Sequence, residues 1–276
     1  MLWDKIKKCT LKCDKIPERS ITNMTYDLQK AGLWKRMAAW MFDMILLSIA
    51  AVGIGVLLSA LLGYDGHSVA LEQGYVAYES QYGVDLRIDR AAYEAMTPEN
   101  QALFNEAHAA LAADEDVLYH YNMMLSLTLV IVSVSILLAY GILEFFVPLR
   151  LQHGRTLGKK IFGLCLVRED GVKVNTLQLF VRTILGKYTV ETMIPVLIVL
   201  MIFWGTMGVM GTAVLLALLC GQLASICFTR ANCAIHDLMA GTAVVDFASQ
   251  SIFDSPEAKL EWQKKLAADR AARQVY

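Results

Sequence analysis

Charge is scarce in this sequence, and long stretches lack it altogether. Only 18% of the 276 residues are Asp, Glu, Lys or Arg, whereas 56% are hydrophobic; soluble domains have roughly 25% and 45–50%. The longest uncharged stretch covers 38 residues, 192–229. Because apolar blocks of this length are typical of membrane spans, the sequence predicts an integral membrane protein.

Several functional signatures are also missing. The six cysteines have no spacing typical of a disulfide framework or a zinc site. No Ser/His/Asp set, HExxH motif or carboxylate pair is found, and Gly158-Lys159 is followed by Lys160 where a phosphate loop requires Ser or Thr. The polar, basic leader before the first apolar run is too long for a secretory signal. We therefore expect no enzyme activity, cofactor, metal ion or nucleic-acid partner.

The apolar blocks predict four membrane-spanning helices. One helix of 38 residues would be roughly 57 Å long, nearly twice the ~30 Å hydrocarbon core, so we divide the uncharged stretch at Gly205–Gly211. Pro195 is expected to kink the third helix. The predicted spans are residues 35–62, 122–147, 188–204 and 207–228. The fold class is accordingly an all-α membrane protein with a four-helix transmembrane bundle.

The basic residues predict the orientation of these helices. Residues 1–36 hold nine Lys/Arg and four Asp/Glu, residues 63–121 hold two and eleven, and residues 148–187 hold eight and two. Segments rich in Lys and Arg stay in the cytoplasm. We therefore expect a cell-membrane protein with both termini cytoplasmic, namely the basic region 1–34 and residues 229–276. Residues 63–121 then form an acidic extracytoplasmic insert.

The segments between the spans carry signals of local structure. Thr97-Pro98-Glu99 is a helix start, so the insert is expected to be helical up to about Ala113. Tyrosines in the insert are expected to cluster, and a solvated cap over the spans is favoured over a ligand platform. These tyrosines are Tyr75, Tyr78, Tyr82 and Tyr93.

The basic loop 148–187 is expected to contain an amphipathic segment and a β-hairpin. The segment 156–163 mixes basic and apolar residues and is predicted to lie at the lipid surface. Asp170-Gly171 lies between two β-prone runs, 164–168 and 172–174, which favours a hairpin. Residues 240–245 read as a further short strand able to pair with it. A last helix is predicted from Ser255-Pro256 onward.

One carboxylate stands inside the first span. Asp43 lies seven residues after Arg36 on nearly the same helix face, and a membrane-embedded carboxylate costs about 3 kcal/mol or more unless it is paired or hydrated. Asp43 begins a ridge whose members from Ala51 onward are all small, which favours close approach of another helix. This ridge is Asp43, Leu47, Ala51, Gly55, Ser59 and Gly63.

Three motifs resemble one known family. The segments KRMAAWMFDMILL, GRTLGKKIFGLCLVREDG and AIHDLMAGTAVV, in this order, are similar to the RDD family of small membrane proteins, named after one arginine and two aspartates. The matching positions are Arg36, Asp43 and, as the best candidate for the third, Asp237. The insert 63–121 and a fourth span are departures from the family core. Further positions of the interfacial motif are Gly154, Thr156, Gly158, Lys159, Gly163 and His236.

The resemblance and the charges leave two hypotheses open. In the structural hypothesis, Arg36 bridges Asp43 and Asp237 as an ion-pair network, and the protein is a membrane scaffold or assembly factor. In the functional hypothesis, Asp43 binds a cation or a proton, and the protein transports a small solute or cation, with cation/proton exchange as one form. The resemblance implies transport of unidentified ligands, and some members look like antiporters. A four-span transporter in the lipid bilayer is expected to be a homo-oligomer.

Overall fold

The computed structural model describes residue 28 and residues 31–229 and 232–274, so most of the basic region predicted at 1–34 lies outside the described residues. Four of its helices are long and apolar enough to cross a membrane. They cover Leu33–Leu62, Glu115–Arg150, Thr176–Phe203 and Val209–Phe228. The predicted fold class, an all-α membrane protein with four spans and a small β element, is confirmed.

The described elements follow the chain in this order: α2 (Leu33–Leu62), α3 (Tyr64–Tyr82), α4 (Arg90–Glu94), α5 (Pro98–Ala113), α6 (Glu115–Tyr140), η2 (Gly141–Phe146), α7 (Val147–Arg150), η3 (Gln152–Gly154), α8 (Leu157–Ile161), β1 (Leu164–Arg168), α9 (Thr176–Phe180), η4 (Val181–Met193), α10 (Ile194–Phe203), α11 (Val209–Phe228), α12 (Ile235–Ala240), β2 (Thr242–Asp246) and α13 (Pro256–Gln274).

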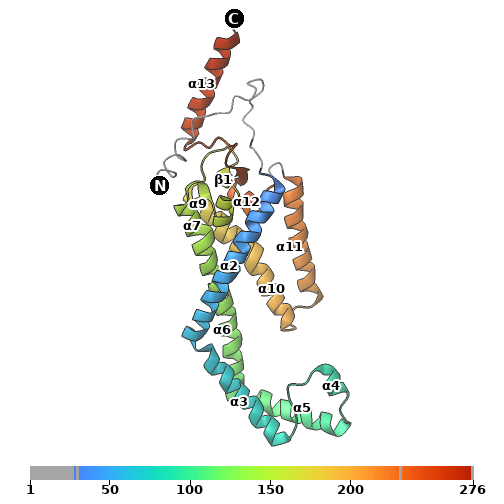
Figure 1. Ribbon diagram of the computed structural model, residues 1–276. Helices are drawn as coiled ribbons and strands as arrows, with labels where there is room; N and C mark the ends of the chain where they lie inside the picture. The colour runs from blue at the N-terminus through green and yellow to red at the C-terminus, as the bar shows by residue number, and fades with distance from the viewer. Residues whose placement is uncertain (1–27, 29–30, 230–231, 275–276) are drawn as a thin grey trace.

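Helices α2 and α6 pack side by side along the small-residue ridge predicted in the first span (Figure 1). Leu47 is buried against Ala139 and Tyr140, with Ala51 packed at the edge of this cluster. A Cβ added at Gly55 would lie 3.7 Å from Ser135 Oγ, which is ordinary van der Waals contact. The ridge therefore serves as the contact surface between the first two spans, as its small residues indicate.

The segment between these spans is helical, as predicted. Helix α3 continues from α2 across Gly63, whose positive φ of 71° gives a left-handed helix end. Helix α5 begins at Pro98, one residue after the cap Thr97. Three of the predicted tyrosines pack around one buried cluster, whereas Tyr93 contacts the Phe104 ring at 5.1 Å. Those three are Tyr75, Tyr78 and Tyr82.

The third span begins at Thr176, earlier than the predicted residue 188. Its first part includes a π-helix, η4, which hydrogen-bonds five residues apart. Pro195 stands at the start of α10, directly after this π-helix ends. A short turn, 204–208, then leads into α11, so the division at the glycines places the last two helices correctly.

The small β element is a two-stranded antiparallel sheet, but it is not the predicted hairpin. Strand β1 pairs with β2, the strand predicted near residues 240–245, with Leu164 opposite Asp246. The Asp170-Gly171 turn folds the chain back only as far as one isolated bridge, between Val167 and Lys173, with a hydrogen bond from the Arg168 N–H to the Val172 carbonyl at 2.9 Å. Lys173 is instead hydrogen-bonded through its backbone N–H to the Phe253 carbonyl at 2.9 Å. The run 172–174 is thus shared between two partners and forms no strand.

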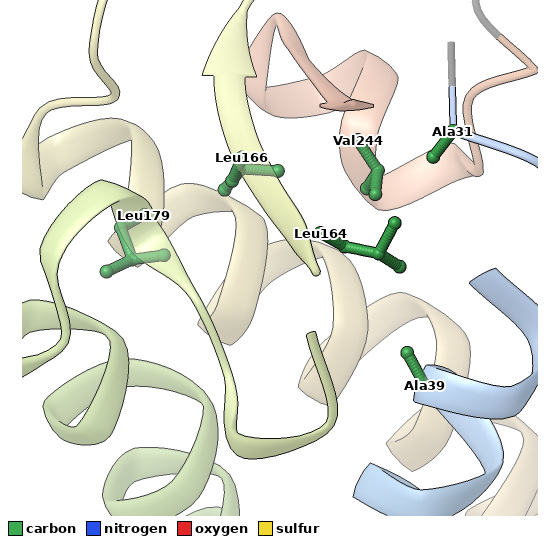
Figure 2. Packing of buried hydrophobic residues seen from close by; sticks show 6 residues of the cluster. All are labelled: Ala31, Ala39, Leu164, Leu166, Leu179 and Val244. Carbon is green, nitrogen blue, oxygen red and sulfur yellow. The ribbon is translucent and has the colours of Figure 1, made fainter. Parts of the chain in front are cut away.

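The sheet is apolar on the side that faces the first span. Leu164 and Leu166 are fully buried, and Figure 2 shows Leu164 directed toward Ala39 of α2, with Val244 beside it. Leu179 of α9 belongs to the same cluster. This core fixes α2, the sheet and the start of the third span relative to one another, at the end of the bundle where the charged residues lie.

Candidate functional site

A cavity of about 550 Å³ opens among α2, η4, α11 and α12. The three residues that the family resemblance singles out, Arg36, Asp43 and Asp237, all line it. Asp43 and Asp237 lie about two hundred positions apart in the chain, so the fold brings both halves of the predicted site to one place. The volume lies within the roughly 300–1,000 Å³ range of small-molecule sites.

Asp43 joins α2 to the short helix α8. Its Oδ1 accepts a hydrogen bond from the Gly158 N–H at 2.7 Å, and its Oδ2 accepts one from the Thr156 hydroxyl at 2.5 Å. Thr156 is also the N-cap of α8, accepting from the Lys159 N–H at 3.3 Å. Both carboxylate oxygens are thus hydrogen-bonded to protein groups, which offsets the cost of placing this charge in an apolar helix.

The packing around Asp43 requires a glycine. A Cβ added at Gly158 would overlap the Ala39 carbonyl oxygen and would come within 2.9 Å of the Asp43 carboxylate. Gly158 and Lys159 are buried against α2, so the prediction that this segment lies at the lipid surface is wrong for them. Lys160 and Ile161, at the end of α8, are exposed. Hydrogen bonding to Asp43 explains why a basic segment turns inward.

Two glycines of the same motif shape the chain on either side of α8. Gly154 and Gly163 have positive φ angles of 60° and 68°, a backbone region that favours glycine. Gly163 lies between α8 and β1, so its turn sends the chain from the Asp43 contact into the sheet. The motif glycines therefore have structural roles.

Asp237 forms a buried ion pair with Arg182. The distance from Arg182 Nε to Asp237 Oδ1 is 2.8 Å, and the two side chains are 2% and 1% exposed. The Thr242 hydroxyl donates a second hydrogen bond to Oδ1 at 3.2 Å. Burial alone would raise the pKa of Asp237, but the Arg182 guanidinium, with a smaller contribution from Arg36, holds this pKa well below its usual range. The carboxylate is therefore ionised, and its direct ion-pair partner is Arg182, where the sequence predicts Arg36.

His236 links this pair to the third span. Its Nδ1 lies 2.7 Å from Glu191 Oε2, and its Nε2 lies 3.0 Å from Arg182 Nη2. Because a guanidinium can only donate, Nε2 must accept, and Nδ1 must then carry the proton that Glu191 accepts. The imidazole is therefore neutral. Burial and the neighbouring Arg182 lower the pKa of His236, against the opposite effect of Asp237, in agreement with this tautomer.

The π-helix explains how one segment supplies both partners of His236. Arg182 and Glu191 are nine residues apart, which is 2.5 turns of an α-helix and would place them on opposite faces. A π-helix hydrogen-bonds five residues apart and therefore has more residues per turn than an α-helix, so the same nine residues make close to two full turns. The two side chains consequently share a face. Gly186 lies between them, and a Cβ there would come within 2.5 Å of His236 Cβ.

A second buried ion pair lies beside the first. Lys187 of η4 contacts Glu144 Oε1 of η2 at 2.7 Å, and the Thr183 hydroxyl donates to the Glu144 backbone carbonyl at 3.0 Å. The Glu144 carboxylate also acts on Lys159. Burial lowers the pKa of Lys159 to about 8, whereas the negative charges of Glu144 and Asp43 oppose this shift. Two π-helical segments thus meet through buried charges.

Most members of this network were not predicted as site residues. Lys187, Glu144 and Glu191 read in the sequence as charges at the ends of spans, and Arg182 reads as one more basic residue of a loop. The signal that could have found Arg182 is electrostatic. A buried aspartate such as Asp237 requires a cation, and Arg182 and Lys187 are the last two basic residues before the uncharged stretch 192–229.

Comparison with known proteins gives a family. The model of the RDD family matches residues 30–241, which include the cavity residues up to Asp237, both π-helices and strand β1. The chain belongs to the RDD family. Searches of curated proteins and of solved structures found no match to this RDD protein. The resemblance to this family is confirmed.

Proposed function

We propose that this RDD protein is a membrane transporter of a small solute that occupies the cavity. One observation carries the proposal: a cavity of about 550 Å³ with both charged and apolar walls lies among the spans. Membrane proteins place ionisable side chains in the apolar region chiefly where a solute or an ion passes. Cation/proton exchange is one form of this activity, and a homo-oligomer is its expected assembly.

The individual carboxylates favour a solute over a bare cation. Asp43 has both oxygens hydrogen-bonded by Thr156 and Gly158, and Glu191 has both bonded by His236. A cation carrier needs carboxylate oxygens that can exchange protein contacts for ion contacts. We therefore assign Asp43 a positioning role, close to the structural hypothesis, and assign solute binding to the cavity as a whole.

Access to the cavity from both membrane faces tests transport without knowledge of the solute. Leu218 lines the cavity, so a Leu218→Cys variant is expected to react with an impermeant thiol reagent in intact cells and also in inside-out vesicles. Leu216→Cys on the same helix is the control, because Leu216 is 61% exposed on the apolar surface and outside the cavity. Reaction of Leu218→Cys from one face only would overturn the proposal.

The labelling uses a background in which Cys9, Cys13, Cys220 and Cys227 are replaced by serine. Cys165 and Cys233 can remain, because burial raises the pKa of these thiols to about 12 and about 11 and leaves little thiolate to react.

The cation/proton form has its own measurement. In proteoliposomes, an Na⁺ or Li⁺ gradient should drive proton flux through the wild type and through Leu216→Trp, and the cavity-filling variant Leu218→Trp should abolish it. Absence of flux in the wild type with either cation would reject cation/proton exchange and leave the labelling result to decide on transport.

One observation supports the alternative function as a membrane scaffold. Helix α13 projects away from the body of the protein (Figure 1), and near its start Trp262 packs on Phe253 with ring centroids 5.3 Å apart. A projecting helix with charged residues is suited to contact a partner. A scaffold predicts labelling from a single face and no flux, so the same two experiments separate the alternatives.

A further inference from the structure

The polar end of the cavity holds more hydrogen-bond donors than its walls can use. Lys159 and Lys187 line the cavity and are 7% and 8% exposed. Each ammonium has three N–H groups. Within the described part of the chain, Lys159 uses one of them on the Thr156 hydroxyl at 3.2 Å, and Lys187 uses one on Glu144. Two N–H groups of each lysine are left without an acceptor there.

Arg182 adds to this surplus. It lines the same cavity at 2% exposure, and its Nε and Nη2 bind Asp237 and His236. A guanidinium has five N–H groups, so three find no acceptor among the described residues. Buried donors of charged groups are costly to leave unpaired.

The acceptors that line the cavity are mostly occupied, and beside it Glu144 Oε2 is buried without a hydrogen-bond partner. Asp43 and Glu191 have both carboxylate oxygens engaged, as described above. Asp237 has its Oδ1 on Arg182, and its Oδ2 lies 3.6 Å from the His236 ring. Arg36 also lines the cavity and adds positive charge. The end of the cavity near Lys159 therefore suits a ligand that brings several anionic oxygens.

The rest of the lining is apolar and reaches the lipid-facing surface. On α11 the lining residues are Leu215, Leu218, Leu219, Gln222 and Ile226, and α2 adds Met37, Trp40 and Met44. Trp40 and Leu219 line the cavity although they are 59% and 55% exposed, so the cavity extends to the surface between α2 and α11. In Figure 1, α2 crosses the front of the bundle and α11 stands at its right-hand edge. In a bilayer, that surface is occupied by hydrocarbon chains.

We infer that the cavity binds an anionic amphiphile from the bilayer, with its phosphate group at Lys159, Lys187 and Arg182 and its hydrocarbon chain between α2 and α11. The donors account for the anionic head group, and the opening to lipid accounts for the chain. This inference rests on the proposed function, because it names the solute class for the same cavity.

Three probes distinguish this ligand from others of related chemistry. The detergent-purified protein is titrated with dioleoyl phosphatidic acid, with dioleoyl phosphatidylcholine and with inorganic phosphate, and bound species are counted by native mass spectrometry. One phosphatidic acid per chain is expected to be retained. Equal retention of phosphatidylcholine would overturn the inference, because it indicates adhesion of chains alone. Equal retention of inorganic phosphate would also overturn it, because a soluble anion would then be the ligand.

Variants locate the bound lipid. Lys159→Met removes two unused donors and is expected to weaken phosphatidic acid binding about tenfold or more, as the loss of a charge-assisted hydrogen bond predicts. Leu218→Trp is expected to weaken it as well, because the indole ring would occupy the space of the hydrocarbon chain. Leu216→Trp, outside the cavity, should bind like the wild type. If Lys159→Met fails to fold, Leu218→Trp still decides. Unchanged binding in Leu218→Trp would place the lipid elsewhere and overturn the inference.

The outcome is separable from that of the transport experiments. Phosphatidic acid binding with labelling from one face only would support the ligand and reject transport. Labelling from both faces without phosphatidic acid binding would support transport and reject this ligand.

Discussion

Gly158 holds two elements together because it has no side chain. Its backbone N–H reaches the Asp43 carboxylate at 2.7 Å, and its Cα lies against the Ala39 carbonyl. A residue of this kind acts through the space it leaves free. We therefore expect a substitution of Gly158 to lower the stability of the protein more than it changes ligand binding.

The variant Gly158→Ala is expected to lower the free energy of unfolding by about 1–3 kcal/mol, the usual effect of overpacking. Its added methyl group would overlap the backbone oxygen of Ala39. The measurement is the melting temperature of the purified protein. Gly53→Ala in α2 is the matched control, since a Cβ there has nothing within 4 Å. Equal melting temperatures for the two variants would contradict the role given to Gly158.

His236 makes stability depend on pH. Its folded pKa lies below the ordinary value of about 6.5. As pH falls, the unfolded chain therefore binds the proton first, and stability present above about 6.5 is lost as pH decreases toward the folded pKa. The melting temperature of the wild type should fall between about pH 6.5 and pH 5 more steeply than that of His236→Gln. Parallel curves would show that His236 does not titrate in this way.

At the residue scale, the sequence predicts which positions matter better than it predicts their contacts. Arg36, Asp43 and Asp237 do line one cavity. Asp43, however, is bound by Thr156 and a backbone N–H, and Asp237 is bound by Arg182. A backbone donor has no signature in a sequence, because every residue except proline has one.

At the scale of elements, the π-helix η4 determines the shape of the site. Its 13 residues, Val181–Met193, turn Arg182, Lys187 and Glu191 toward the cavity. The sequence predicts the third span from residue 188 because spans are identified by their lack of charge, and these three charges lie before the uncharged stretch 192–229. The pairing of β1 with β2 could be predicted from the sequence. That residues 172–174 form no strand could not, because Phe253 competes for their backbone hydrogen bonds.

The buried pair between η4 and α12 should couple these elements strongly. Asp237→Leu leaves Arg182 as an uncompensated buried charge and is expected to cost about 3–5 kcal/mol of stability. The double variant Arg182→Met/Asp237→Leu should lose less than the sum of the two single variants. Melting temperatures of all three measure this non-additivity.

An exposed pair provides the comparison for this double variant. Arg90 and Glu94 form an i,i+4 pair whose side chains are 91% and 60% exposed. Glu94→Gln is expected to change stability by less than about 0.5 kcal/mol. Strict additivity at Arg182 and Asp237 would mean that the ion pair contributes no more than two independent side chains do.

At the scale of the whole molecule, charge and shape both bear on how the protein crosses the membrane. The four spans are evident from apolar length alone, which is why they were predictable. Their orientation is predicted only from the distribution of Lys and Arg. The segment 63–121 carries eleven acidic and two basic residues and is expected outside the cell.

Asp85 lies in this segment and is exposed. An Asp85→Cys variant, in a background without exposed native thiols, should react with an impermeant thiol reagent added to intact cells. Reaction only after permeabilisation would reverse the orientation. The same variant in inside-out vesicles is the control and should be protected.

The spans differ in length, so the longest of them extends beyond the hydrocarbon core of the bilayer. The helix Glu115–Arg150 has 36 residues and is roughly 54 Å long, whereas α11 has 20 residues and is roughly 30 Å long, the thickness of the hydrocarbon core. Figure 1 shows the two helices level at the end that carries β1 and α12, so the surplus lies at the opposite end, beside α3. Helices α4 and α5 are therefore expected to lie beyond the hydrocarbon core on that side. A binding partner on that side would contact α4 and α5 away from the lipid head groups, because the longer helix and α3 hold them there as a short stalk.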